Sequence, residues 1–275
     1  MSSLTTARAL PAPRTLRVPA RRVARFTGAV LTRIAALGAL ALAWEILPRV
    51  GAVDAVFLPP LSEVLVAWWD LLASGELWSH TSASLGRSAA GFGLAIAVAV
   101  PLGLLIGWYT PVANLLNPLL EVFRNTAALA ILPVFVLILG LGETSKVAII
   151  FYGCTWPILL NTVSGVRTVD PLLIKSARSL GLGPVRLFQK VVLPAAVPTI
   201  FTGIRLAGAA SILILIAAEM VGAKAGLGYL INYAQYNFAV PDMYAGIITI
   251  SAIGLLVNQL LVVTERRFST WRTHS

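Results

Sequence analysis

Six long apolar runs dominate this chain of 275 residues and restrict it to folds that lipid can surround. They are Gly28–Leu47, Gly86–Trp108, Thr126–Leu141, Thr144–Val166, Ala196–Val221 and Met243–Val263. Most reach the length of about 20 residues that a helix needs to cross the hydrocarbon core of a bilayer. Hydrophobic residues make up 58% of the chain and charged residues only 12%, about half of their share in soluble proteins. We therefore expect an all-α integral membrane protein with six transmembrane helices.

The third run is ambiguous, because a shorter apolar segment, Val112–Phe123, precedes it. A helix of about 12 residues is about 18 Å long, which is too short to cross the membrane. We interpret this segment as an interfacial or entry helix that leads into a span containing Pro133. A seventh span is the alternative, and it would place the two termini on opposite sides of the membrane.

The distribution of basic residues favours six spans. With the N-terminus in the cytoplasm, 15 of the 21 Lys and Arg residues fall in inner tails and loops, whereas three fall in outer loops. The positive-inside rule then predicts cytoplasmic termini in an inner or plasma membrane. The expected regions are a basic tail (1–27), a first span (28–47), an outer loop (48–85), a core of five spans (86–264) and a C-terminal tail (265–275). Because the net charge of +10 lies between apolar runs, it does not indicate nucleic-acid binding.

Two outer segments have recognisable patterns. Pro60 can begin an amphipathic helix, since apolar residues follow it at steps of three and four, and we expect this helix to lie in the outer interface. Beyond the fifth span, Gly226 and Gly228 interrupt the apolar pattern. We predict that they shape an outer gate or a contact for a partner protein. A plain turn is the alternative.

The connection between the fourth and fifth spans, residues 170–194, has the most regular local pattern. Asp170 can cap a helix that begins at Pro171, and Gly181 can provide the left-handed position that ends it. Pro184 can then start a second short helix, which predicts two helices that meet at a glycine elbow.

The first of these helices presents an apolar stripe of Leu173, Ala177 and Leu180, with Lys175 and Arg178 on another face. The stripe needs the membrane-facing core or a second protein to cover it. The small side chains of Ala177 and Gly181 would let a partner approach closely. A membrane-surface helix held by anionic lipid is the alternative.

The same segment resembles the cytoplasmic signature of permease subunits in binding-protein-dependent ABC importers: Glu-Ala-Ala, three residues, Gly, nine residues and Ile-x-Leu-Pro. The chain reads Lys175-Ser176-Ala177, three residues, Gly181, nine residues and Val191-Val192-Leu193-Pro194. Lys175 and Ser176 replace the usual Glu and Ala. Stretches such as Leu58-Pro59-Pro60 and Gly140-Leu141-Gly142-Glu143 are similar to permeases for aliphatic sulfonates, taurine and nitrate. Related permeases carry thiamine-precursor-like and other small solutes, so the solute remains open.

The resemblance implies the ABC type-1 transmembrane fold, a second permease copy, two cytoplasmic ATPase subunits and an extracytoplasmic solute-binding protein, with no cofactor or metal. It implies alternating access for a small, anionic solute. It also implies a cytoplasmic coupling loop that contacts the ATPase through Asp170, Lys175, Ser176, Ala177, Gly181, Leu193 and Pro194. The chain lacks the Gly-x-x-x-x-Gly-Lys-Ser/Thr loop that cradles nucleotide phosphates, so we expect a transport subunit and not an enzyme.

Two arginines are candidates for the path of an anionic solute. Arg205 follows Gly203 in the fifth span, and Arg124 lies beside the break before Pro133. Snorkelling to the membrane surface is the alternative for Arg205. An ion-coupled carrier or a channel is the rival class of function. A carrier usually places several acids at mid-bilayer, whereas Glu45 and Glu219 fall near the ends of predicted spans.

Overall fold

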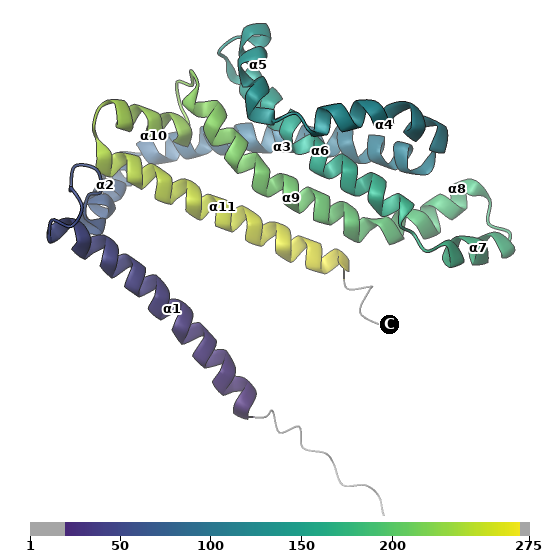
Figure 1. The fold of residues 1–275 in the computed structure, drawn as a ribbon, viewed down its shortest axis with the longest axis horizontal. Helices are drawn as coiled ribbons and strands as arrows, with labels where there is room; N and C mark the ends of the chain where they lie inside the picture. The colour runs from purple at the N-terminus through teal and green to yellow at the C-terminus, as the bar shows by residue number, and fades with distance from the viewer. Residues whose placement is uncertain (1–19, 270–275) are drawn as a thin grey trace, which may run out of the picture.

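The computed structural model describes residues 20–269, with side chains from 35 to 265, and every regular element in that range is helical (Figure 1). In chain order the elements are α1 (Ala20–Arg49), α2 (Leu61–Ala73), α3 (Glu76–Trp108), α4 (Thr110–Arg124), η1 (Ala128–Ile131), α5 (Leu132–Leu139), α6 (Glu143–Arg167), α7 (Pro171–Ser179), α8 (Pro184–Leu187), η2 (Phe188–Val192), α9 (Leu193–Met220), α10 (Leu227–Tyr236) and α11 (Val240–Ser269). The all-α prediction is confirmed for this part of the chain. Most of the two predicted tails lies outside the described residues.

Four helical segments are long and apolar enough to cross a membrane: α3, α6, the continuous run Pro184–Met220, and α11 up to Glu265. They contain the predicted second, fourth, fifth and sixth spans. All four begin earlier than predicted, α3 and the fifth segment by at least ten residues, at Glu76 and Pro184. The first predicted span lies within α1, where many side chains are outside the described range. The count of six spans therefore stays a prediction.

The centre of the bundle is α6, which packs between α3 and α9. A Cβ atom on Gly91 would meet Ile150, one on Gly103 would meet Thr162, and one on Gly107 would meet Val166. This constant offset means that α3 and α6 run parallel. On the other side of α6, Gly203 faces Asn161 and Gly165 faces Ala196, so α9 runs antiparallel to α6. Small residues at such crossings let apolar helices approach closely.

Because α3 and α6 run parallel, the chain must return between them, and α4, η1 and α5 make this return. The short helix predicted at Val112–Phe123 is present as α4, and the predicted break after it is an 83° bend between Thr110–Arg124 and Ala128–Leu139. The third run is not one long α-helix, because α5 has only eight residues, about 12 Å. Asn125 and Thr126 donate side-chain hydrogen bonds to the carbonyls of Glu121 and Val122, which ends α4. Arg124, the last residue of α4, therefore lies at this bend, beside the break that the sequence predicts.

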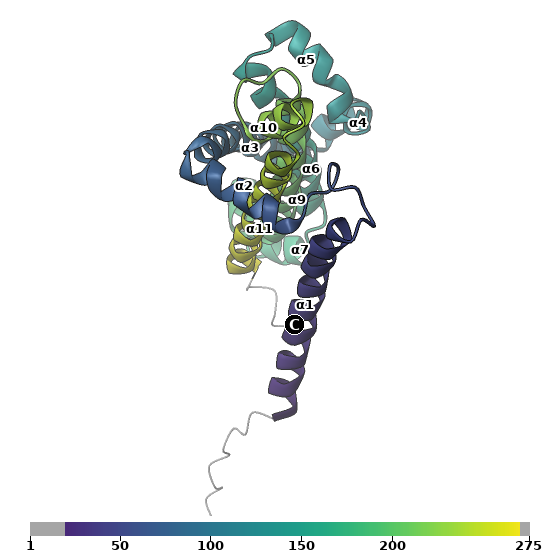
Figure 2. The ribbon, with the colours of Figure 1, turned by 90° about the vertical axis from the view of Figure 1, so that its left-hand side faces the viewer.

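At one end of the bundle, α2 and α10 pack against the first turns of α11 through an apolar cluster. The helix predicted after Pro60 is confirmed as α2. Its N-terminus is held to α1, because the Ser62 amide donates to the carboxylate of Glu45 at 2.9 Å. Away from this junction, α1 diverges from the bundle (Figure 2), and Leu37, Leu40 and Leu42 are exposed. The apolar face of α1 is thus not covered by this chain.

The α3–α6 crossing gives a direct test of the fold. We expect Gly103→Val to lower stability by about 1–3 kcal/mol, because its Cβ would lie 2.6 Å from the Thr162 Cβ in a packed interface. Gly93→Val, on the same helix, is the matched control, since no atom lies within 4 Å of the added Cβ. Thermal unfolding of both purified variants in detergent measures the difference. Equal stability of the two variants would contradict the close crossing.

Candidate functional site

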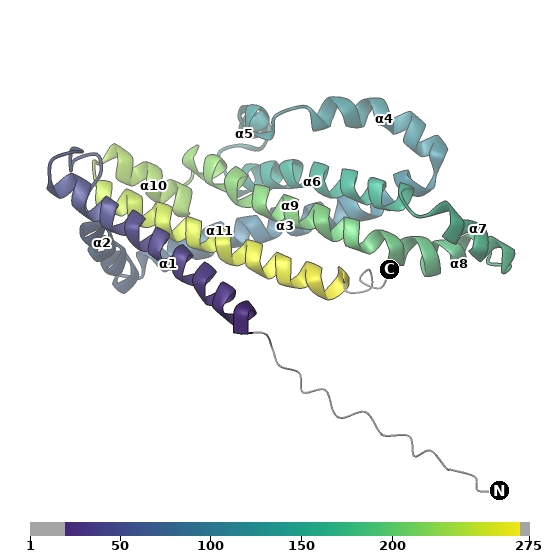
Figure 3. The ribbon, with the colours of Figure 1, turned by 60° about the horizontal axis from the view of Figure 1, so that its bottom comes forward.

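The residues singled out in the sequence lie at opposite ends of the bundle. The elbow formed by α7 and α8 is at one end, and α10 with the loop Val221–Gly226, which the sequence analysis expects outside the membrane, is at the other (Figures 1 and 3). The long helices α3, α6, α9 and α11 run between these two ends. Any coupling between the ends must therefore pass along these helices.

The glycine elbow is present as predicted. The Asp170 carboxylate accepts a hydrogen bond from the Leu172 amide at 2.8 Å and caps α7. At the other end of α7, Gly181 has a φ of +77°. The Gly181 amide donates to the Arg178 carbonyl and the Leu182 amide donates to the Ala177 carbonyl, which is the Schellman pattern of helix termination. The local signals in the sequence are thus sufficient to form this turn.

The elbow is attached to the ends of three long helices. Val166 and Val169, at the end of α6, form a buried cluster with Val192, Ala196 and Ile200. Two aromatic rings extend this cluster to α3, because Trp108 contacts Phe188 edge-on with a centroid distance of 5.2 Å. A displacement of the elbow would therefore be transmitted to α3, α6 and α9.

The elbow exposes several large apolar side chains among its charged ones. Leu172, Leu173, Leu180 and Val185 are all exposed. Lys175, Ser176 and Gly181 are also exposed. Ala177 differs from the prediction, because it is buried at 6% exposure and does not lie on the surface open to a partner. Leu172, Leu173 and Leu180 lie outside the candidate membrane spans, and exposed apolar side chains in such a place are typical of a protein contact surface.

A π-helical turn joins the elbow to the fifth span. Pro194 has no amide hydrogen, so it cannot donate to the carbonyl of the preceding turn. The chain widens by one residue at this point, and the Leu193 amide donates to the carbonyl of Phe188. The helix continues through Leu193 and Pro194 without a loop. These two signature residues thus connect the elbow rigidly to α9.

At the opposite end, a buried charge cluster lies between α3, α6 and α9. Arg87 of α3 donates through Nη1 to Glu219 at the end of α9, at 2.6 Å. Glu219 is fully buried, and Ser84 donates a second hydrogen bond to it. The sequence places Glu219 near the end of a predicted span and gives no sign that Arg87 contacts it. Their contact was not predicted, since 132 residues separate them in sequence.

The cluster holds the N-terminus of α10. The amide of Gly226 donates to His80, the amide of Leu227 to Ser84, and the amide of Gly228 to Glu219. Gly226 has a φ of +120°, and a Cβ on Gly228 would lie 2.6 Å from the Ile216 carbonyl oxygen. Gly226 and Gly228 are both buried. They therefore seat the loop Val221–Gly226 on this cluster, and within the described residues they are covered and do not face an open passage.

A second carboxylate reaches the same arginine from α6. Glu143 forms a two-pronged contact with the Nε and Nη2 atoms of Arg87, of which Nη2–Oε1 measures 2.7 Å. Lys146, one turn further on, is buried and donates to the carbonyls of Leu141 and Gly142. Two charged side chains thus hold the corner between α5 and α6: Arg87 binds Glu143, and Lys146 binds the carbonyls of the two residues before Glu143.

The two arginines expected on the solute path are not brought together. Arg205 forms an ion pair with Glu265 of α11 at 3.2 Å, and Thr202 donates to the same carboxylate. Arg124 pairs with Glu121 on the exposed side of α4 at 3.1 Å. Both guanidinium groups are therefore partly neutralised within the chain.

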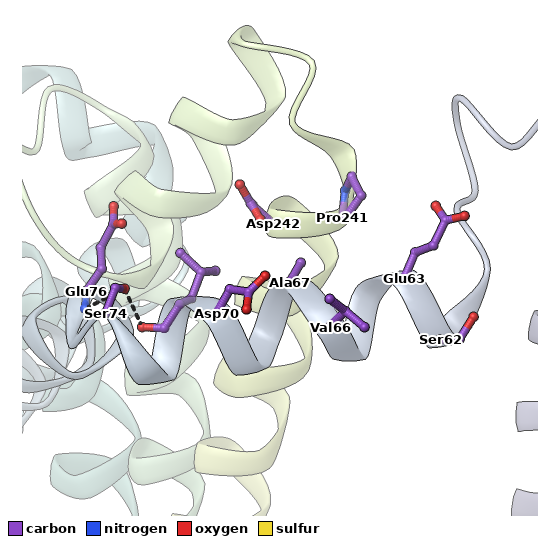
Figure 4. A pocket seen from close by; sticks show the side chains of 10 residues that line it. Ser62, Glu63, Val66, Ala67, Asp70, Ser74, Glu76, Pro241 and Asp242 are labelled. Carbon is purple, nitrogen blue, oxygen red and sulfur yellow. Dashed lines mark hydrogen bonds between the residues drawn. The ribbon is translucent and has the colours of Figure 1, made fainter.

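A groove of about 680 Å³ lies between α2 and the start of α11 (Figure 4). The carboxylates of Glu63, Asp70, Glu76 and Asp242 line it, as the close view shows, and no Lys or Arg side chain does. An acidic lining repels an anion. We therefore place no anionic solute in this groove.

Comparison with known proteins supports the family that the elbow indicates. The sequence profile of the binding-protein-dependent transport system inner membrane component matches residues 99–270. The taurine transport system permease protein TauC of Escherichia coli is 32% identical over 88% of this chain and 90% of that protein. The bicarbonate transport system permease protein CmpB of Synechococcus elongatus is 36% identical over 71% of this chain and 70% of its own length.

The aliphatic sulfonates transport permease protein SsuC of Bacillus subtilis is 34% identical over 83% of each chain. An inward-facing structure of the MetNI methionine ABC transporter shares the fold, with a TM-score of 0.59 and 18% identity over 72% of this chain and 96% of that chain. Because the profile covers more than half of the chain and these three permeases exceed 30% identity over most of it, the chain belongs to the binding-protein-dependent transport system inner membrane component family, the permease subunits of ABC transporters.

Proposed function

We propose that this chain is the membrane-spanning subunit of an ATP-driven importer that moves a small oxyanion-bearing solute by alternating access. The observation that carries the proposal is the elbow, because it exposes an apolar surface while its inner side is packed onto the ends of α3, α6 and α9. An ATPase subunit that bound this surface could move three helices together. The family membership supports such a partner.

The proposed assembly contains two copies of this chain, two cytoplasmic ATPase subunits and an extracytoplasmic solute-binding protein. Asp170, Lys175, Ser176, Gly181, Leu193 and Pro194 would shape or line the ATPase contact, and Ala177 would support it from the inside. The uncovered apolar residues of α1 are consistent with a second copy or lipid as a neighbour. The proposed topology has six spans with both termini in the cytoplasm of an inner or plasma membrane.

The class of solute follows from chemistry that the named relatives have in common. Aliphatic sulfonates, taurine and bicarbonate each carry a negatively charged oxygen group, and three similar permeases are named for them. Arg124 and Arg205 remain the proposed contacts along the path, since each is only partly buried and its carboxylate partner could be exchanged for a passing anion. We propose a solute-binding protein with its own anion site as the main source of selectivity.

The first test is uptake by the complete assembly. Proteoliposomes containing this chain, its cognate ATPase and its solute-binding protein should accumulate taurine, an alkanesulfonate, nitrate or bicarbonate only when ATP is supplied. The chain alone should show no uptake above that of empty liposomes, because it lacks a phosphate-binding loop. ATP-independent uptake by the chain alone would contradict the proposal and favour a carrier or channel.

Topology can be tested separately. Alkaline phosphatase fused after Val53 or after Lys224 should be active, because both sites are proposed to lie outside the cytoplasm and this enzyme needs an oxidising compartment. Fusion after Arg178 in the elbow should be inactive and serves as the matched cytoplasmic site. Active enzyme at the elbow would reverse the proposed orientation.

The coupling role predicts a specific effect at Gly181. Gly181→Val should strain the left-handed position by about 1–2 kcal/mol and tilt the start of α8. No atom lies within 4 Å of the added Cβ, so we expect normal amounts of the variant in the membrane. Co-purifying ATPase, and solute taken up per ATP hydrolysed, should both decrease.

Two variants control for this effect. Gly183→Val lies in the same turn with an ordinary φ of −69° and equal space around its Cβ, so it should behave as the wild type. Gly181→Asn should retain much of the coupling, because Asn tolerates the left-handed conformation. Normal ATPase binding and coupling in Gly181→Val would remove the elbow from the coupling interface.

A further inference from the structure

Arg87 links the outer ends of three helices, and its two carboxylate partners differ sharply in exposure. The side chain of Arg87 is 6% exposed, that of Glu219 is 0% exposed and that of Glu143 is 67% exposed. One arginine thus joins a partner that water cannot reach to a partner that faces water. Separating Arg87 from Glu219 therefore costs more free energy than separating it from Glu143.

The contact with Glu219 resists opening. Separating the two groups would leave an uncompensated charge in a site without water, which is strongly unfavourable. Nη1 of Arg87 also donates to the carbonyl of Ala225 at 2.6 Å, and Glu219 holds the amide of Gly228. This side of Arg87 therefore keeps the outer loop Val221–Gly226 seated on α3.

The contact with Glu143 can open at lower cost. Its side chain is 67% exposed at the end of a helix, so water can replace the guanidinium as its hydrogen-bond donor. Glu143 is the first residue of α6 and follows Gly140, which has a φ of +79°. The α5–α6 corner, residues Gly140–Glu143, is therefore held to the rest of the outer end partly by this exposed contact.

The same corner also touches the outer loop directly. A Cβ on Gly222 would lie 3.7 Å from the Cβ of Leu141 and 2.6 Å from its Cδ2. Corner and loop thus meet at two places, the charged contact through Arg87 and the apolar contact at Leu141. We call these two segments, joined in this way, the outer latch.

We propose that Arg87 is a positioning residue of the transport cycle, which keeps the outer loop seated through Glu219 and closes the outer latch through Glu143. Release of Glu143 separates the corner from the loop, and this separation accompanies opening toward the solute-binding protein. The proposal rests on the proposed function as a permease. It assigns to Arg87 and Glu143 a role in the cycle and not contact with the solute.

A disulfide across the latch tests the requirement for separation. The Cβ separation of 3.7 Å at Leu141 and Gly222 suits a disulfide. Leu141→Cys combined with Gly222→Cys, in a Cys154→Ala background, should crosslink under a mild oxidant. In the complete reconstituted transporter, the oxidised form should lose at least about tenfold in uptake and in binding-protein-stimulated ATPase activity, and reduction should restore both.

The two single-cysteine variants in the same background are the controls, and the oxidant should not affect their uptake. Mass spectrometry of the digested protein quantifies the crosslink. Complete crosslinking with unchanged uptake would overturn the proposal, because the latch would then never need to open. Failure to crosslink in folded protein would overturn the contact on which it rests.

Glu143→Gln tests the charged contact without a cysteine. Loss of the negative charge should weaken the closed state and raise ATPase activity in the absence of the binding protein by about fivefold. Glu63→Gln removes an exposed carboxylate at the same end that forms no ion pair within the described residues, and it should leave this activity unchanged. A purely structural role of Glu143 would lower stimulated and unstimulated activity together, and that result would overturn the proposal.

Uptake by the wild-type transporter distinguishes a failure of the outer latch from a failure of the proposed function. ATP-driven uptake by the wild type, together with normal uptake by the oxidised double-cysteine variant, would reject the outer latch and leave the proposed function intact. Absence of ATP-driven uptake by the wild type with both partners would reject the proposed function itself, and the outer latch with it.

Discussion

The close packing of α6 between α3 and α9 is the constraint on which the other features depend. Gly91, Gly103 and Gly107 let α3 run parallel to α6 in direct contact. Parallel neighbours require a return of the chain between them, and the bent passage of α4 and α5 provides it. The same packing brings the starts of α3 and α6 to the end of α9, and the opposite ends of these helices to the elbow.

The two ends of the bundle differ in what they expose and bury: one exposes apolar side chains, and the other buries charged ones. At the elbow, apolar side chains remain exposed, so that surface gains free energy when a second protein covers it. At the opposite end, Arg87 and Glu219 are buried, and each has partners from other parts of the chain. A buried ion pair contributes little net stability, but loss of one partner is costly. Such a pair therefore specifies which helix ends meet, more than how strongly they meet.

The elbow could be predicted from the sequence because its signals are local, whereas the length and direction of the third helical segment depend on the rest of the fold. The signals at Asp170, Pro171 and Gly181 act within one or two turns, so they are readable without the rest of the fold. The third run had a suitable length and composition, but hydropathy carries no information about direction. The sequence predicted a break beside Arg124, but the 83° bend there and the eight-residue length of α5 became visible only in three dimensions. Ala177 was likewise placed on the correct helix, but only the tertiary structure shows that its side chain is buried.

The sequence by itself determined the membrane class, the family and the two-helix elbow, because composition, local capping and short spacings set them. Only the tertiary structure decided the parallel arrangement of α3 and α6, the bent return between them and the partners of the buried charges. Arg87 and Glu219 are 132 residues apart, and nothing local to either residue indicates the other. Their contact exists because the glycine-lined crossings bring the ends of α3 and α9 together, and two opposite charges buried there must pair.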